Sequence, residues 1–92
     1  MDLDHMPLRG RAHSRLRFEL NRQGALHRHE LELLLDAADA LLFDEPESAL
    51  LRAQALDLLN RLESSERRTS GEVARLRAAL HGCAAPFNAM AA

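Results

Sequence analysis

The sequence predicts an all-α protein: a small antiparallel helical hairpin or bundle of three to four helices that completes a larger bundle by dimerisation. Three observations lead to this fold class. Nineteen of the 92 residues are leucine and 16 are alanine, with three phenylalanines and no Trp or Tyr, a composition typical of helix bundles. Apolar residues recur at steps of three and four, the spacing of one helix face. A chain of this length forms one domain with a modest core.

We expect three regions along the chain. Residues 1–10 are predicted to be irregular, because Pro7 and Gly10 both break regular structure. Residues 11–82 form a single helical domain, and residues 83–92 form a C-terminal tail. The predicted helices cover about residues 12–23, 25–43, 46–63 and 70–81.

The first predicted helix places His13, Leu16 and Leu20 on one stripe. Gly24 follows this helix. A glycine inside a helix costs about 1 kcal/mol relative to alanine. Gly24 therefore either ends the first helix or marks a close approach inside one continuous helix, and the break is favoured.

The second predicted helix carries more apolar surface than an ordinary helix. Its leucines form a main stripe and a second apolar edge, and together they span an arc of about 200°, against about 100° for a typical surface helix. One neighbouring helix cannot cover such an arc, so the sequence predicts that this face docks on a partner or a second copy. The predicted interface residues are Leu26, Leu31, Leu33, Leu34 and Leu41.

The third predicted helix begins after a short acidic turn. Asp44 is expected to cap this helix, because its carboxylate can accept from the free amides of the first turn while Glu47 reaches back. Pro46 fits in a first turn, where no amide needs a partner. The connection is so short that the second and third helices must run antiparallel, as an αα-hairpin.

The last predicted helix has clear signals at both ends. Thr69 and Glu72 have the spacing of a capping box at its start. Gly82 follows its last turn and is placed to take the left-handed conformation that often ends a helix.

Charge is distributed unevenly, although the formal net charge is only −2. Residues 1–28 carry six Arg against three acids, residues 29–66 carry ten acids against two Arg, and residues 67–92 carry four Arg against one acid. We expect the basic ends to pack beside the acidic middle, or beside its copy in a dimer, with weak surface pairing. All 12 basic residues are Arg, which indicates either selection for bidentate contacts or a GC-rich, bacterial genome.

Nothing in the sequence indicates a catalytic, cofactor or metal site. His27 and His29 are two residues apart, so on a helix they point about 160° away from each other and cannot hold one ion. Cys83 follows a predicted helix C-terminus, whose partial negative charge opposes thiolate formation. Phosphate-binding glycine loops, nucleophile elbows and zinc patterns are absent. We therefore expect no enzyme activity, no cofactor and no small-molecule substrate.

One polar cluster could bind a partner. On the side of the first helix opposite its leucines, three guanidinium groups and one aromatic ring could meet phosphates or the carboxylates of an acidic partner. The alternatives are a solvated helix face and internal pairing with the acidic segment. These residues are Arg11, Arg15, Phe18 and Arg22.

These features favour a small cytoplasmic interaction module. No apolar run approaches the length of a membrane span, about 18 residues. The N-terminus lacks the basic-then-apolar order of a signal peptide. A single cysteine favours a reducing compartment. We expect an adaptor, a chaperone-like protein or an anti-activator that acts by helix–helix docking, as a homodimer or on another protein, with no membrane partner. The alternative is a dimeric nucleic-acid-binding regulator that uses the Arg-rich face on phosphates.

Overall fold

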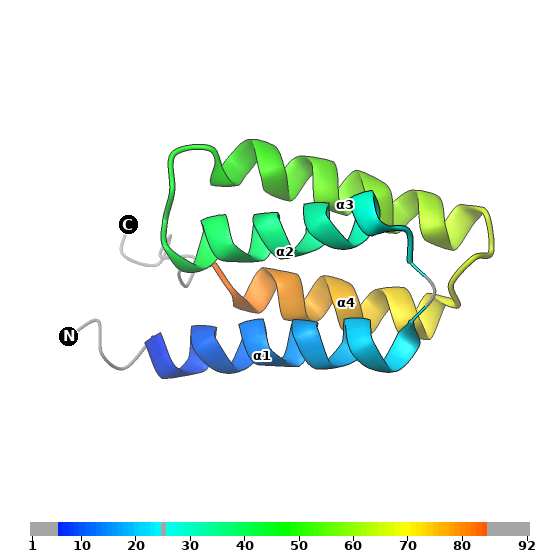
Figure 1. Cartoon of the computed structure of the whole chain (residues 1–92), viewed down its shortest axis with the longest axis horizontal. Helices are drawn as coiled ribbons and strands as arrows, with labels where there is room; N and C mark the ends of the chain where they lie inside the picture. Colours follow the sequence, from blue (N-terminus) through cyan, green and yellow to red (C-terminus); the bar gives the residue numbers. More distant parts are fainter. Residues whose placement is uncertain (1–5, 25, 85–92) are drawn as a thin grey trace, which may run out of the picture.

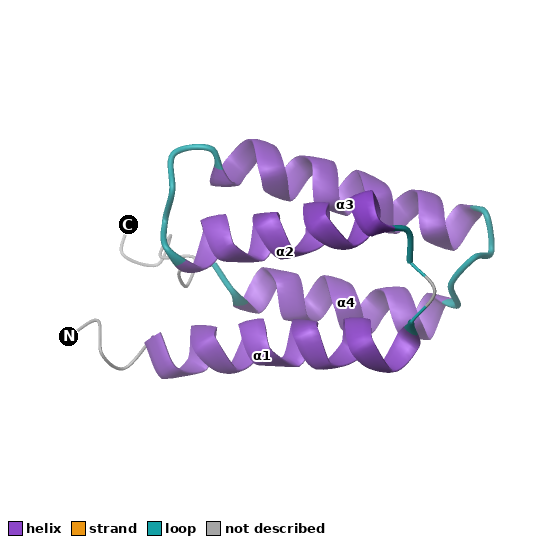
Figure 2. Ribbon diagram, in the orientation of Figure 1, coloured by secondary structure: helices purple, strands orange, loops and turns teal. Residues whose placement is uncertain are grey.

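The computed structural model describes residues 6–24 and 26–84, and it contains four α-helices joined by short loops (Figure 2). They are α1 (Met6–Gln23), α2 (Arg28–Leu42), α3 (Ser48–Ser64) and α4 (Ser70–Gly82). This part of the chain contains no strand, which confirms the all-α prediction. None of its helices combines the length and the apolar character needed to cross a membrane.

The helices run alternately up and down in a four-helix bundle (Figure 1). α1 packs most closely on α4 and α2 on α3, while α1·α2 and α3·α4 are the looser neighbouring pairs. One chain thus forms a four-helix bundle by itself, and the predicted dimerisation stays a prediction. The apolar arc of α2 is covered because α1 and α3 flank it and α4 lies across the core.

Leucines from all four helices fill the space between them, helped by alanines where helices come close. Burial of this kind supplies most of the stability of a small helical domain, because isolated helices of this length are marginal in water. The large side chains that are completely shielded from water are Leu16, Leu34, Leu59, Leu62, Leu76, Leu80, Val73 and Cys83.

The N-terminal helix begins earlier than predicted. Residues 6–10 are helical, so the expectation of an irregular segment at 1–10 is wrong for this part, and residues 1–5 lie outside the described residues. Pro7 is tolerated because the first turn of a helix needs no amide partner at that position. Arg9 adds tertiary anchoring: its Nε donates to the carbonyl oxygen of Cys83 at 2.9 Å, and its Nη2 lies 3.1 Å from a carboxylate oxygen of Asp44.

Asp44 does not cap α3 as predicted. It takes a left-handed conformation, φ 54°, just after α2. Its amide donates to the carbonyl oxygen of Leu41, and the amide of Glu45 donates to that of Ala40, the two bonds that close a helix C-terminus in this way. Asp44 is thus the end of α2, and α3 begins only at Ser48, with no side-chain cap.

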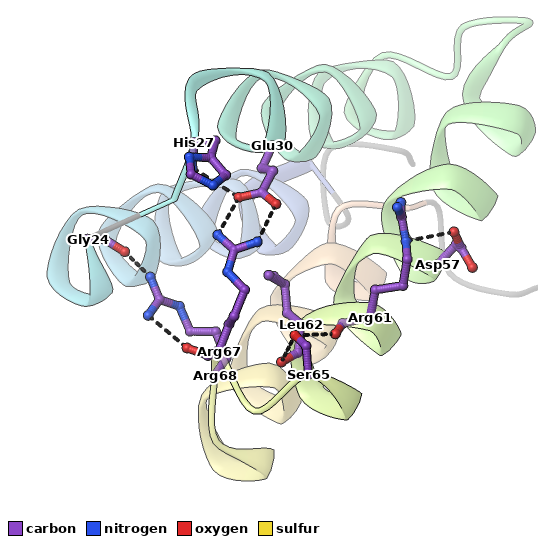
Figure 3. Close-up of polar contacts among 9 residues, drawn as sticks. All are labelled: Gly24, His27, Glu30, Asp57, Arg61, Leu62, Ser65, Arg67 and Arg68. Carbon is purple, nitrogen blue, oxygen red and sulfur yellow. Dashed lines mark hydrogen bonds and ion pairs between the residues drawn. The ribbon is translucent and has the colours of Figure 1, made fainter.

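The loops at the opposite end of the bundle are tied together by arginines (Figure 3). Gly24 ends α1 at φ 62°, which confirms the predicted break. Arg68 donates to the carbonyl oxygen of Gly24, and Arg67 binds the buried Glu30 through two hydrogen bonds of 2.8 and 2.9 Å. The amide of His27 also donates to Glu30. These contacts join the α1–α2 loop to the α3–α4 loop.

The start of α4 agrees with the sequence, and its end does not. Thr69 and Glu72 form the predicted capping box. Gly82, however, is the last residue of α4, and Gly24 is the glycine with positive φ in the described residues. A Cβ atom at Gly82 would lie 2.7 Å from Cβ of Ala12, so this glycine allows α4 to approach α1. Cys83 is buried in the core and does not begin a loose tail; residues 85–92 lie outside the described residues.

Candidate interaction surface on α1 and α4

The predicted leucine docking surface is mostly internal. Leu34 is completely buried and Leu41 is 6% exposed, so the prediction that these two contact a partner is wrong. Leu26, Leu31 and Leu33 are partly buried and pack against the same core. The sequence argument allowed α2 only one neighbouring helix, whereas the fold gives it neighbours on both sides.

The Arg-rich face of α1, in contrast, points to solvent. Arg11 and Arg15 are exposed, and Phe18 is 59% exposed. Within the described part of the chain neither arginine forms an ion pair. Leu8, also 59% exposed, continues the same helical row. We call Leu8, Arg11, Arg15, Phe18 and Arg22 the outer row of α1.

Arg22 differs from the other two arginines because it has an internal partner. Its Nη2 lies 2.7 Å from Oε1 of Glu19, which is 5% exposed at the junction of α1 and α4. Nε of Arg75 lies 3.4 Å from the same oxygen. The hydrogen bond from Arg22 is the main reason that the pKa of Glu19 is lowered, with a smaller contribution from Arg75. Glu19 therefore stays ionised, and its negative charge offsets part of the positive charge of Arg22 and Arg75.

Arg11 and Arg15 line two neighbouring hollows on the surface. The first, of about 290 Å³, lies between α1 and α4, with alanines on its floor and Arg75 on its far side. The second is more open and runs along α1 beside Phe18. Neither is lined by an acid, so carboxylates or phosphates could approach both arginines. The residues that line the two hollows are Gly10, Arg11, Ala12, Ser14, Arg15, Phe18, Arg75, Ala78 and Ala79.

The two halves of the bundle carry opposite net charge. α1 and α4 together carry seven Arg against Glu19 and Glu72, whereas α2 and α3 carry six acids against three Arg. Some charge is paired between the halves, as expected from the sequence: Nη2 of Arg77 on α4 lies 3.8 Å from Oε1 of Glu63 on α3. Arg11 and Arg15 of the outer row nevertheless have no ion-pair partner among the described residues.

Histidine and cysteine chemistry is limited. His27 precedes α2 in an extended conformation, so its ring stacks on that of His29 at 5.8 Å; the expectation that the two rings point apart is wrong. In residues 6–24 and 26–84 no group of three or more His, Cys, Asp or Glu side chains is arranged to hold a metal. Burial raises the pKa of the Cys83 thiol to about 11, so it is protonated near neutral pH and is a poor nucleophile.

Two members of this surface were missed in the sequence. Leu8 lies three residues before Arg11 and seven before Arg15, so its helical spacing could have revealed it, but Pro7 and Gly10 argued against a helix there. Arg75 could not be found from its spacing, because only the packing of α4 on α1 brings it beside Ala12 and Arg15. No protein-family model, curated protein or solved structure matches this chain.

Proposed function

We propose that this protein is a small cytoplasmic interaction module, working as an adaptor, a chaperone-like protein or an anti-activator, that binds an acidic surface of a partner protein through the outer row of α1. One observation supports this most strongly. Arg11 and Arg15 are exposed and form no ion pair in the described part of the chain, while the leucines of α2 are used inside the bundle.

The composition of the outer row favours a protein partner over a nucleic acid. Exposed Leu8 and Phe18 stand on either side of the arginine pair, and apolar residues beside charges are typical of protein interfaces. Arg11 and Arg15, the two arginines of this row without an ion pair among the described residues, supply few phosphate contacts, whereas a DNA-binding protein that makes six to ten such contacts gains most of its affinity from them. The acidic α2 and α3 half adds no surface for a polyanion.

The proposal is tested by affinity capture from cells of the source organism with three baits: wild type, Arg11→Glu/Arg15→Glu, and the matched control Arg28→Glu/Arg52→Glu on the acidic half. We expect a partner that wild type and control capture with or without nuclease and that the first variant does not. Binding of the purified partner should then weaken at least tenfold in the first variant, measured by calorimetry. Equal capture by all three baits contradicts the proposal.

A nucleic-acid-binding regulator remains the second candidate, because Arg11 and Arg15 lie one helical turn apart beside an exposed aromatic ring. If this candidate is correct, nuclease treatment removes the partner protein that the wild-type bait captures. Binding of duplex DNA or single-stranded RNA then weakens with salt, with a slope of about −1 to −2 on a logarithmic plot, and Arg11→Gln/Arg15→Gln flattens that slope. A gel shift without binding at low salt eliminates this candidate.

A further inference from the structure

We infer that the outer row of α1 receives a single α-helix of the partner, and that the facing row of that helix carries two acids four residues apart between two apolar residues. This inference rests on the proposed function and specifies its partner. It follows from the spacing, the charge and the hollows of this one surface.

The outer row has the spacing of a helix–helix contact. Its residues follow one another at steps of three, four, three and four, the rhythm with which two helices pack side by side. α1 already uses another face for its own bundle, where Leu16 and Leu20 are buried. The outer row is thus a second packing face of the same helix, and among residues 6–24 and 26–84 no other element covers its exposed arginines.

The order of side chains along the row defines the partner. Two arginines occupy its middle, and an exposed apolar residue stands at each side, Leu8 before them and Phe18 after them. A helix that matches this order carries an apolar residue, an acid three residues later, an acid after four more, and an apolar residue after three more. The steps three, four, three read the same in both directions, so parallel and antiparallel helices satisfy the pattern equally.

The hollow between α1 and α4 supports a helical occupant. Ala12, Ala78 and Ala79 line it, and small side chains let a helix come close. Arg75 on the far side of the hollow supplies a third guanidinium within the same groove. An acidic helix seated on the outer row therefore meets positive charge on both sides.

A second copy of this chain is a poor occupant. The pattern requires two acids four residues apart, and the sequence contains one such pair, Glu32 and Asp36. His29 precedes this pair and Asp39 follows it at the flanking positions, where apolar residues are needed. Asp39 is in addition engaged by His13 within its own bundle. We therefore assign the occupant to another protein.

Two synthetic peptides test this inference on the intact chain. The matched peptide carries the pattern Leu-x-x-Glu-x-x-x-Glu-x-x-Leu in an Ala/Gln helix of about 20 residues, a length at which helices begin to form in water. In its isomer both glutamates move two residues along, which turns them about 200° away from the leucines. Affinities are measured by fluorescence anisotropy, with a 20-nucleotide single-stranded RNA and a duplex DNA as further probes.

We expect the matched peptide to bind about tenfold more tightly than its isomer, and this preference to decrease as salt is raised. Arg11→Gln/Arg15→Gln should abolish the preference, and the control Arg28→Gln/Arg52→Gln should retain it. Phe18→Gln should weaken binding of the matched peptide about fivefold to tenfold, whereas Phe43→Gln, an equally exposed phenylalanine after α2, should leave it unchanged.

Equal binding of the two peptides, including no binding of either, overturns the inference. So does tighter binding of RNA or DNA that depends on Arg11 and Arg15, which would assign the row to nucleic acid. Concentration-dependent dimerisation that Arg11→Gln/Arg15→Gln abolishes would assign the row to a second copy. If a captured partner depends on these arginines but the peptides do not discriminate, the proposed function stands and the helical occupant is wrong; if no partner depends on them, the proposed function fails as well.

Discussion

Two rows of residues in this bundle share one helical spacing, but one row is buried and the other is exposed. On α2, Leu34, Ala38 and Leu41 follow one another at steps of four and three and are buried in the core. On α1, Arg11, Arg15 and Phe18 follow the same steps and are exposed. Helical spacing thus identifies a face that suits another helix, but it does not say where that helix comes from. On α2 the leucines of this row are covered by the chain's own helices, whereas on α1 Arg11, Arg15 and Phe18 stay exposed.

The first prediction asks whether the α2 row belongs to the fold. Leu34→Ala should lower the free energy of unfolding by about 3 kcal/mol, because it removes a completely buried side chain and leaves a cavity. This is a large share of the about 5 to 15 kcal/mol that such domains possess. Urea denaturation followed by circular dichroism measures it.

Leu50→Ala is the matched control, because Leu50 is 62% exposed on α3. It should change the free energy of unfolding by less than about 0.5 kcal/mol. Similar losses in the two variants would contradict the assignment of the α2 row to the core. A loss for Leu34→Ala that depends on protein concentration would return the row to an interface between copies.

The second prediction compares paired with free charges. Arg67, which is partly exposed, forms an ion pair with the buried Glu30, whereas Arg11 has no acid partner in the described part of the chain. Glu30→Gln should lower the free energy of unfolding at pH 7 by about 2 kcal/mol, because it breaks the pair and weakens the link between two loops. Glu32→Gln, an exposed neighbour without an ion pair in the described residues, should have little effect.

The same pair makes stability depend on pH. Hydrogen bonds from Arg67 are the main cause that lowers the pKa of Glu30 from its ordinary value near 4.5 to about 2. The unfolded chain binds this proton at a higher pH than the folded chain does, so the stabilisation is complete above about pH 4.5 and is lost as pH falls toward 2. The difference in unfolding free energy between wild type and Glu30→Gln should narrow over this range. A constant difference from pH 7 to pH 2.5 would contradict the assignment.

Features that depend on residues close together in the sequence could be predicted, and features that depend on distant residues could not. The Thr69–Glu72 capping box and the break at Gly24 depend on residues within one turn, and both were predicted correctly. Asp44 was misassigned because it closes α2 instead of capping α3, and its carboxylate accepts from Arg9, 35 residues away. The Arg-rich face was identified from spacing, but its groove was not, because Arg75 reaches it only through the packing of α4 on α1. Long-range partners, and thus which faces remain exposed, require the fold.

The third prediction concerns the seam that places α4 beside the outer row. Gly82→Ala should lower the free energy of unfolding by about 1 to 3 kcal/mol, because its Cβ would lie 2.7 Å from Cβ of Ala12 and force α1 and α4 apart. Gly10→Ala, with no atom within 4 Å of the added Cβ, should instead raise it by about 0.5 to 1 kcal/mol. Thermal unfolding shows whether each variant raises or lowers the free energy of unfolding. If both variants shift in the same direction, the close approach of the two helices at Gly82 is wrong.

The fourth prediction has the smallest effect on stability and bears most directly on function. Arg11→Gln/Arg15→Gln should change the free energy of unfolding by less than about 0.5 kcal/mol, with the sign favouring the variant, because like charges four residues apart on a helix repel each other by about 0.2 to 0.5 kcal/mol. Raising salt should remove this gain, since exposed charges are screened. A loss above 1 kcal/mol in urea denaturation would show that these arginines support the fold. A slight gain would show that the folded chain tolerates repulsion that brings it no stability, which is expected if the pair serves a partner.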